Sequence, residues 1–270
     1  MFPAFNTITT PSVDLPAAID LAQRHDFQAL GLWVDKVEAC GATEAAQRLR
    51  DAGLRVSTLC PSGSFSDAGP AGLAAAIDRT RRTLDLAATV RAECLVLLVG
   101  TFHRHARDTE AAVERARQGL QTVLAHARSL GVSIALEPLH PMYRAEWNLI
   151  NTLGEANDWT EVLGPGLGVL VDSYHVWWDR QLEVELRRAG REGRILGFHI
   201  NDWRVPTRTW HTDRELPGRG VIDLPQMIGW LQDAGYDRWA EVEVFSEDYA
   251  REAPDKVWAA ARESLRALGI

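Results

Sequence analysis

A short apolar run followed by a longer amphipathic stretch repeats eight times along the chain. We expect strands at 3–9, 28–34, 54–60, 94–100, 132–138, 167–173, 194–201 and 239–245. We expect helices at 14–26, 42–52, 70–90, 107–130, 152–163, 180–190, 223–235 and 254–268. Eight such units can close into a parallel barrel, whereas an open doubly wound sheet usually has fewer strands and often carries a glycine-rich phosphate loop, which this sequence lacks. The pattern predicts an α/β fold, a single (β/α)₈ TIM barrel that occupies residues 1–270 as one domain.

Length and composition suit such a barrel. A chain of 270 residues has the usual size of one (β/α)₈ domain. Hydrophobic residues make up 46% and charged residues 24%, as in ordinary soluble proteins. Apolar runs stop well short of a membrane span, and the start of the chain lacks the basic region and apolar core of a secretion signal. We therefore expect a cytoplasmic protein with no membrane partner.

Charge and cysteine usage exclude other classes. The formal net charge of −8 argues against a nucleic-acid partner, because contact with phosphates is normally made by a basic face. Cys40, Cys60 and Cys94 are too few and too scattered for a disulfide framework or a thiolate zinc site. We interpret them as reduced, buried thiols.

Four of the expected strands deliver a potential metal ligand to their ends. The segments are VSIALEPLH (132–140), GVLVDSYHVWWD (168–179), GFHIND (197–202) and AEVEVF (240–245). The ligands that they supply are Glu137, Asp172, His199 and Glu243. Three carboxylates and one imidazole without a thiolate form a hard site for a divalent cation. We expect Mn²⁺, with Mg²⁺ and Co²⁺ as alternatives.

Strand alternation indicates which way these acids point. Successive side chains of a strand face opposite sides of the sheet. Glu137 therefore shares the inner face with Ser133 and Ala135, while its branched apolar neighbours face the helices. Glu243 shares its face with Glu241, which lies one layer deeper. We expect Glu241 to form a buried ion pair there.

Aromatic and basic residues gather in segments that would line the mouth of the barrel. Segment 203–223 is long for a loop after a strand, and we expect it to be a lid. Segment 140–151 is shorter and aromatic, and would lie beside the metal. Trp33 ends the second strand, where an aromatic plane suits a sugar ring, while His140 and His175 are placed to contact substrate. We interpret four further histidines as surface or lid residues: His103, His105, His126 and His211.

The same segments resemble a known family. FNTITT, GLWVDK, LEPLHPMY, GRGVIDLPQMIGWLQDAGY and EVEVFSE are similar to the xylose isomerase-like superfamily of TIM barrels, in particular the sugar phosphate isomerase/epimerase family with its ketose 3-epimerases and inosose-processing enzymes. The resemblance implies a metal held by Glu137, Asp172, His199 and Glu243. It also implies that His175 binds substrate, and it assigns contact with the sugar to Arg204 or Arg208.

These residues favour proton transfer next to a carbonyl. The expected function is a divalent-metal-dependent sugar isomerase or epimerase that acts on a ketose or a related polyol ketone through an enediolate. Glu137 and Glu243 are the expected catalytic pair. Return of the proton to the opposite face gives an epimer, return to the neighbouring carbon gives an aldose–ketose isomer, and loss of a β-leaving group gives elimination. The sequence leaves these three outcomes open.

Two further classes stay open. LEPLHPMY and VDSYHVWWD also resemble the catalytic subunit of C-glycoside deglycosidases, which implies a metal-dependent lyase or dehydratase on an oxidised sugar or C-glycoside, with a small partner subunit. An endonuclease IV-like phosphodiesterase has the same barrel but needs a multi-metal cluster with more histidines. In the favoured interpretation the partner is a small-molecule sugar, and a homo-oligomer is left open.

Overall fold

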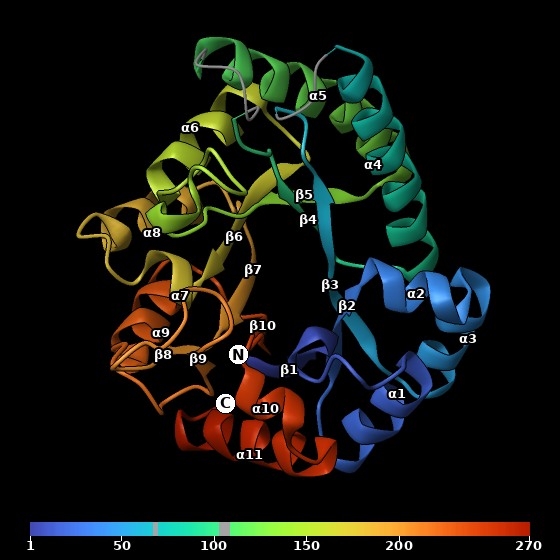
Figure 1. Cartoon of the computed structure of the whole chain (residues 1–270), viewed down its shortest axis with the longest axis vertical. Helices are drawn as coiled ribbons and strands as arrows, with labels where there is room; N and C mark the ends of the chain where they lie inside the picture. Colours follow the sequence, from blue (N-terminus) through green and yellow to red (C-terminus); the bar gives the residue numbers. More distant parts are fainter. Residues whose placement is uncertain (67–69, 103–108) are drawn as a thin grey trace.

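A computed structural model of the chain describes residues 1–66, 70–102 and 109–270. Within these residues, eight parallel strands form a closed barrel in the order β1-β10-β7-β6-β5-β4-β3-β2 (Figure 1). The barrel strands are β1 (Phe2–Asn6), β2 (Ala29–Trp33), β3 (Arg55–Gly63), β4 (Cys94–Leu98), β5 (Ser133–Leu136), β6 (Leu167–Asp172), β7 (Ile195–Ile200) and β10 (Trp239–Val242). Pairing of β1 with β10 closes the barrel. The predicted (β/α)₈ barrel is confirmed.

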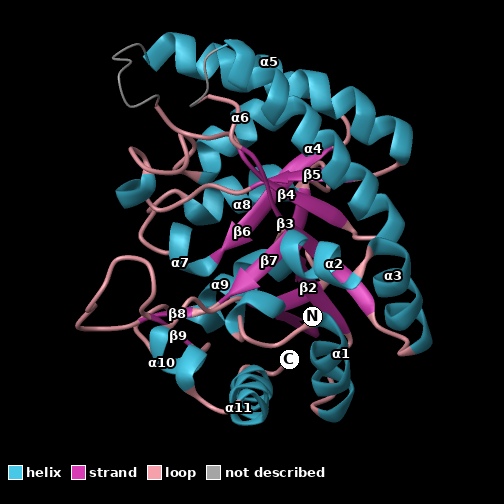
Figure 2. Cartoon of the chain, turned by 45° about the vertical axis from the view of Figure 1, so that its right-hand side comes forward, coloured by secondary structure: helices cyan, strands magenta, loops and turns pink. Residues whose placement is uncertain are grey.

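Helices surround the barrel and follow its strands (Figures 1 and 2). They are α1 (Leu15–Arg24), α2 (Val34–Cys40), α3 (Ala42–Asp51), α4 (Pro70–Val90), α5 (Thr109–Leu130), α6 (Leu153–Leu163), α7 (Ser173–Val176), α8 (Leu182–Gly190), α9 (Leu224–Asp233), α10 (Glu247–Arg251) and α11 (Pro254–Ala267). Two 3-10 turns are described as well, η1 (Thr7–Thr9) and η2 (Pro141–Tyr143). Each predicted helix has a counterpart, although the first two residues of the helix expected at 107–130 lie outside the described residues.

Several short elements go beyond the predicted pattern. The helices α2, α7 and α10 contain 7, 4 and 5 residues, which is too short to show a helical period in the sequence. Inside the loop expected to be a lid, β8 (Asp202–Trp203) pairs antiparallel with β9 (Arg214–Glu215). The loop is therefore partly ordered by its own two-stranded sheet.

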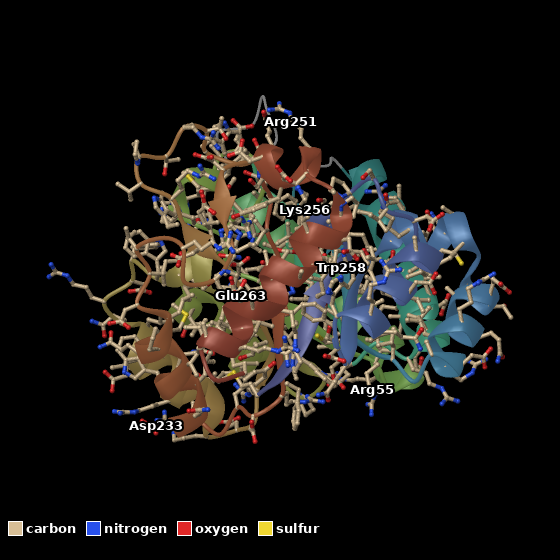
Figure 3. All side chains as sticks on the ribbon, turned by 90° about the horizontal axis from the view of Figure 1, so that it is seen from below. Arg55, Asp233, Arg251, Lys256, Trp258 and Glu263 are labelled. Carbon is tan, nitrogen blue, oxygen red and sulfur yellow. The ribbon has the colours of Figure 1, made fainter. Side chains whose placement is uncertain are left out.

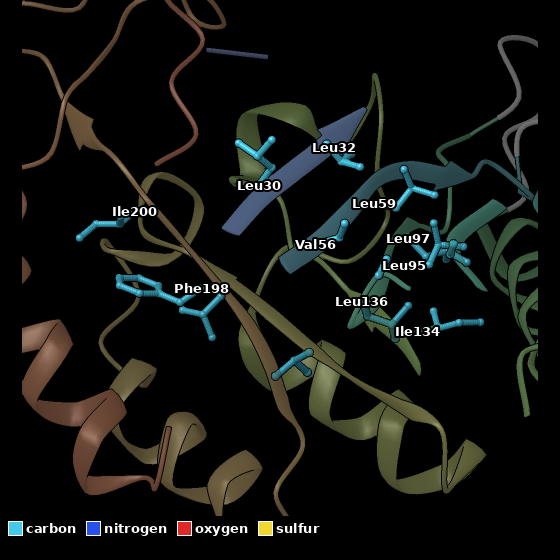
Figure 4. Close-up of a cluster of buried hydrophobic side chains, with 14 of the residues drawn as sticks. Leu30, Leu32, Val56, Leu59, Leu95, Leu97, Ile134, Leu136, Phe198 and Ile200 are labelled. Carbon is cyan, nitrogen blue, oxygen red and sulfur yellow. The ribbon is translucent and has the colours of Figure 1, made fainter. Parts of the chain in front are cut away.

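The main core lies between the barrel and the helices. Figure 4 shows its apolar side chains on successive strands, among them Leu30, Leu95 and Phe198, and all three are fully buried or nearly so. Each such side chain contributes roughly 1.5–3 kcal/mol when it leaves water. A smaller cluster with Cys94, Ala135 and its neighbours fills the inside of the barrel. No helix of the described residues has the length and mean hydropathy needed to cross a membrane.

Side-chain caps fix where several helices begin. Asp14 accepts a hydrogen bond from the N–H of Ala17 at the start of α1, and Asp223 caps α9 in the same way. Thr152 and Glu155 form a reciprocal capping box at the start of α6. These caps hold the loops that precede the helices, including the loop after β5 that carries site residues.

The last helix covers the seam where the barrel closes. Trp258 of α11 is fully buried and stacks on Phe5 of β1, with ring centroids 3.7 Å apart. Its indole N–H donates a hydrogen bond of 3.1 Å to the hydroxyl of Thr10. Figure 3 shows α11 in red beside the blue N-terminal elements, with Trp258 labelled. The closure of β1 on β10 is thus supported from outside by an aromatic contact.

Candidate metal centre

Four side chains from four neighbouring strands meet at one end of the barrel. They are Glu137 directly after β5, Asp172 at the end of β6, His199 in β7 and Glu243 directly after β10. One ligand atom of each lies within 4.8 Å of the others, and all four residues are buried. His199 Nδ1 is 3.3 Å from Glu243 Oε2 and 3.9 Å from Glu137 Oε1. The structure thus brings together the four residues that the sequence places at separate strand ends.

Glu241 lies beneath this cluster and contacts the other side of the imidazole. Its Oε1 is 3.1 Å from His199 Nε2. The same carboxylate accepts hydrogen bonds from Asn6 Nδ2 at 2.6 Å and from Thr58 Oγ1 at 2.8 Å. This is the buried ion-pair position expected for the deeper acid of the last strand. It leaves His199 Nδ1 as the ring nitrogen that faces the other carboxylates.

Burial and mutual repulsion shift the titration of the cluster. Burial raises the pKa of Glu137 well above its usual value, and the neighbouring Glu243 carboxylate raises it further. Burial alone would lower the pKa of His199, but the carboxylates of Glu243 and Glu241 outweigh it and raise that pKa well above the usual value. The shift of Glu137 thus arises first from burial, whereas that of His199 reflects the negative charge around the imidazole.

This negative charge matches a divalent cation. Among the described residues, the site holds four buried carboxylates and one fixed cation, namely Glu137, Asp172, Glu241, Glu243 and Arg214. With the carboxylates ionised and His199 neutral, as coordination through Nδ1 requires, three negative charges are uncompensated. Both ring nitrogens of His199 lack a hydrogen-bond partner among the described residues, but Nε2 lies 3.1 Å from Glu241 Oε1 and Nδ1 faces the other carboxylates of the cluster. Carboxylate oxygens and the imidazole Nδ1 form a donor set that fits a hard or borderline divalent ion.

Arg214 is the arginine of the site, and sequence reasoning missed it. It is buried, and its Nη1 lies 2.9 Å from Asp172 Oδ2 and 3.4 Å from Glu243 Oε2. Its guanidinium lies over the rings of Tyr174 and Phe245, at 4.6 and 4.7 Å. The carboxylates of Asp172 and Glu243 raise the pKa of Arg214 above its usual value although burial opposes this, so the side chain is a fixed cation.

The two arginines expected to contact substrate lie elsewhere. Arg204 pairs with Asp213, Glu215 and Asp248, and Arg208 pairs with Asp213 and Asp248. In the described residues, neither lines the cavity beside the cluster. Alternation in β9 explains the difference, because the acids before and after Arg214 turn toward these two arginines and Arg214 turns into the barrel. The triplet Asp-Arg-Glu, taken as a strand, was the signal that could have identified it.

His175 and His140 form a connected pair. The N–H of His140 donates a hydrogen bond of 3.1 Å to His175 Nδ1. Arg214 Nη2 lies 3.1 Å from His175 Nε2, which is also 3.7 Å from Asp172 Oδ2, so each ring nitrogen of His175 faces a group that can only donate. Burial and the charge of Arg214 hold the pKa of His175 well below its usual value. His175 is thus a neutral imidazole held between the backbone of His140 and the guanidinium of Arg214.

A cavity of about 530 Å³ opens beside the cluster. It is lined on the cluster side by Glu137, His175, Arg214 and Glu243. Elsewhere the lining combines aromatic residues with polar and charged ones, among them Trp33, Trp147, His211, Phe245, Ser64, Thr101 and Glu146. Cys60 lines it too, and burial raises the pKa of this thiol to about 12. The side chain of His140 is outside this lining within the described residues.

The remaining histidines differ in exposure, and two of the three cysteines are buried. His211, expected to be a surface or lid residue, lines the cavity, and burial and Arg214 lower its pKa to about 4. His126 contacts the exposed acid Asp85. His103 and His105 lie outside the described residues. Cys60 and Cys94 are buried free thiols as predicted, whereas Cys40 is only partly buried.

The chain is similar in sequence to a known family and to curated proteins. The family model for xylose isomerase-like TIM barrels matches residues 19–268. An inosose isomerase of Halalkalibacterium halodurans is 28% identical over 142 residues, which are 51% of this chain and 48% of that protein. The match therefore spans about half the length of this curated relative.

Solved structures agree over the whole chain. Protein SMc04130 of Sinorhizobium meliloti 1021 is 41% identical with a TM-score of 0.96, and the match covers 98% of each chain. The IOLI protein, solved with a zinc atom, is 20% identical with a TM-score of 0.86, covering 99% of this chain and 98% of that one. At this identity the second likeness concerns the fold alone. With its barrel and the family match over most of its length, the chain belongs to the xylose isomerase-like TIM barrel family.

Proposed function

We propose that this protein is a divalent-metal-dependent isomerase or epimerase of a ketose or a related polyol ketone. The observation that carries the proposal is the double position of Glu137 and Glu243, which belong to the metal-ligand cluster and also line the cavity. The partial match to an inosose isomerase supports the same class. Because the match spans about half of each protein, the proposal names a class of substrate and not the inosose of that enzyme.

The proposed metal ligands are the side chains of the cluster, Glu137, Asp172, His199 through Nδ1, and Glu243. The hard donor set favours Mn²⁺, with Mg²⁺ and Co²⁺ as alternatives. A bound cation supplies positive charge that stabilises the oxygen of a developing enediolate. Glu241 and its hydrogen bonds keep the imidazole in the orientation that this role needs.

Glu137 and Glu243 are the proposed proton carriers. They follow directly after strands β5 and β10, which are separated in the barrel by β6 and β7. A substrate carbon between them is therefore approached from two sides. One carboxylate removes the proton next to the carbonyl, and the other delivers a proton to the opposite face.

Arg214 and His175 are the proposed substrate-positioning residues. The Nη2 atom of Arg214 and Nε2 of His175 lie 3.1 Å apart, and both residues line the cavity. In this contact the guanidinium donates to the imidazole, which orients the remaining N–H groups of Arg214 for a substrate oxygen. The fixed positive charge of Arg214 also favours negative charge on that oxygen.

Solvent deuterium exchange tests the proposal. Turnover of a ketose in heavy water should place deuterium at the carbon that changes, because a carboxylic acid exchanges its proton with solvent before returning it. Glu137→Gln and Glu243→Gln should each lower the rate by roughly 10²–10⁴-fold. Glu146→Gln is the matched control, since this carboxylate lines the same cavity outside the cluster. Product without deuterium would indicate hydride transfer and would contradict the two-carboxylate mechanism.

A further inference from the structure

Cys60 enters the barrel from the strand that lies directly opposite the strand of His199. In the closed order, three strands separate β3 from β7 in either direction. Because alternate residues of a strand share a face, Cys60 points inward with Thr58, whose hydroxyl donates a hydrogen bond of 2.8 Å to Glu241 Oε1. Cys60 lies one pleat nearer the mouth and lines the cavity together with Glu243. The thiol is therefore at the depth of the ligand cluster, above Glu241.

This thiol belongs to a second group of potential metal ligands. One ligand atom each of Cys60, His199 and Glu243 lies within 4.8 Å of the other two, and all three residues are buried. His199 and Glu243 are also members of the first cluster, with Glu137 and Asp172. A neutral imidazole has one free lone pair and therefore binds one cation at a time. The two groups are alternative sites, because an ion in either one engages His199.

The two groups prefer different ions. The first cluster offers three carboxylates, which suit Mn²⁺ and Mg²⁺. The thiol site, defined as Cys60, His199 and Glu243, has one sulfur in place of two of these carboxylates, and thiolate ligands favour Zn²⁺ and softer ions such as Cd²⁺. Three protein ligands of this kind leave the fourth position of a tetrahedral Zn²⁺ open to water. Cys60 and Glu243 line the cavity, from which the ion and its water can enter.

The surroundings of Cys60 let its sulfur bind a cation while His199 keeps its support. The thiol donates a hydrogen bond of 3.4 Å to Thr58 Oγ1, and its proton leaves for solvent when a cation binds the sulfur. One S–H bond is exchanged for one bond to the ion, so no oxidant or reductant takes part. The hydrogen bonds of 2.8 and 3.1 Å from Thr58 to Glu241 do not involve the sulfur. Glu241 can thus remain beside the imidazole whichever site is filled.

We propose that Cys60, His199 and Glu243 form a second cation site, selective for Zn²⁺ and other ions that bind thiolate, and that an ion held there excludes the ion of the first cluster. The effect on turnover rests on the proposed function. Glu243 would serve the ion at the thiol site, and Glu137 and Asp172 would be left without theirs. Zn²⁺ would then inhibit the enzyme in competition with Mn²⁺.

Titration of the full chain with Cd²⁺, after removal of bound metal with EDTA, tests the site. A Cd²⁺–thiolate bond gives an ultraviolet charge-transfer band, whereas Cd²⁺ bound by carboxylates and imidazole alone gives none. One equivalent of Cd²⁺ should produce the band in the parent protein. A large excess of Mn²⁺ should shift this titration to higher Cd²⁺ concentration, because the two ions compete for His199.

Cys60→Ser should abolish the band and leave Mn²⁺ affinity unchanged. The ratio of Zn²⁺ affinity to Mn²⁺ affinity should fall by at least about tenfold, since loss of a residue that merely supports a metal ligand already costs that much. Cys60→Ala should behave in the same way, so the test does not depend on one variant that folds. Glu137→Gln should show the opposite pattern, with Mn²⁺ affinity lowered by roughly 10–100-fold or more and the Cd²⁺ band retained.

Cys40→Ser and Cys94→Ala are the matched controls, because Cys40 is a partly buried thiol and Cys94 is a buried one in the same inner cluster as Cys60. Both should keep the band. No band in the parent protein, a band that persists in both Cys60 variants, a band lost in either control, or a Cd²⁺ titration unaffected by Mn²⁺ would each overturn the proposal. Binding is measured without turnover, so failure here is distinguishable from failure of the deuterium test.

Discussion

Glu241 differs from Glu243 by one pleat in depth, and this small difference separates their roles. Glu243 reaches the cavity, whereas Glu241 contacts His199 Nε2 and accepts hydrogen bonds from the barrel interior. A buried acid in this place fixes the tautomer of the ring and increases its basicity at the other nitrogen. The site therefore depends on residues that touch neither metal nor substrate. Gly31 is one of them, because its missing side chain leaves room for Glu241.

Gly31→Ala should disturb the site by displacing the Glu241 carboxylate. A Cβ at this position would lie 1.8 Å from Glu241 Oε1, so the carboxylate must move away from His199. We expect a loss of about 1–3 kcal/mol in the free energy of unfolding and a roughly 10–100-fold loss of Mn²⁺ affinity. Gly229→Ala is the control, since nothing lies within 4 Å of the added Cβ in α9. It should stabilise the protein by about 0.5–1 kcal/mol. Unchanged metal affinity in the Gly31 variant would separate Glu241 from metal binding.

Arg214→Met should change metal and substrate binding in opposite directions. The guanidinium lies 2.9 Å from Asp172 Oδ2, so its removal leaves the carboxylates more negative and should raise Mn²⁺ affinity by about tenfold or more. Sugar turnover should fall, because a donor at the cavity is lost. Arg208→Met, whose partners are Asp213 and Asp248, should change neither quantity by more than about twofold. Weaker metal binding in the Arg214 variant would show that the arginine supports the site structurally.

At the scale of elements, two loops build the mouth and are tied to each other. The segment after β5 supplies Tyr143 and Trp147, and the loop after β7 supplies Trp210, His211 and Arg214. The sheet of β8 and β9 orders part of the second loop, and Asp213 forms an isolated bridge to Ser246 after β10. Such ties limit how far the loop can open. Closure of 203–223 over substrate stays a prediction.

Tyr143→Phe should loosen the tie between these loops. The variant removes only the hydroxyl that donates to the carbonyl oxygen of Trp210 at 2.7 Å. Limited proteolysis should then cut within 203–223 several-fold faster than in the unaltered protein. Tyr236→Phe is a matched control, since that hydroxyl donates to the carbonyl oxygen of Trp239 at 2.8 Å, outside the cavity lining. If both variants are cut at the same rate as the parent protein, the hydrogen bond of Tyr143 does not restrain the loop.

The sequence predicted the elements that are long enough to show a periodic pattern, and it did not predict the short ones. All eight barrel strands and the convergence of Glu137, Asp172, His199 and Glu243 were predictable, because strand ends of a parallel barrel meet on one side. Arg214 was missed because β9 has two residues, too few to show alternation against the surrounding loop. Contacts between loops depend on tertiary packing, and periodicity carries no information about them.

For the whole molecule, the main electrostatic feature is a buried excess of negative charge in a chain that is itself acidic. The formal net charge of −8 makes entry of a cation favourable at long range. At the cluster, the buried carboxylates of four neighbouring strands, β5, β6, β7 and β10, repel one another, and the proposed cation would relieve that repulsion.

Metal removal should lower the melting temperature. At a Mn²⁺ concentration about 100 times its dissociation constant, binding adds about 2.7 kcal/mol to the stability, and a chain of this size gains roughly 5–10 °C. Scanning calorimetry with Mn²⁺ and with EDTA measures the difference. His199→Gln and Asp172→Asn should fold and lose most of the shift. A full shift in both variants would place the cation at another site.

Closure of the barrel by its first and last strands has a consequence for synthesis. Phe2 pairs opposite Trp239, and Glu243 follows directly after β10. A nascent chain that has emerged from the ribosome only as far as β7 has neither a closed barrel nor the fourth ligand. The proposed metal site is therefore complete only after the last strand has emerged, and until then the acids that follow β5 and end β6 have no partner from β10.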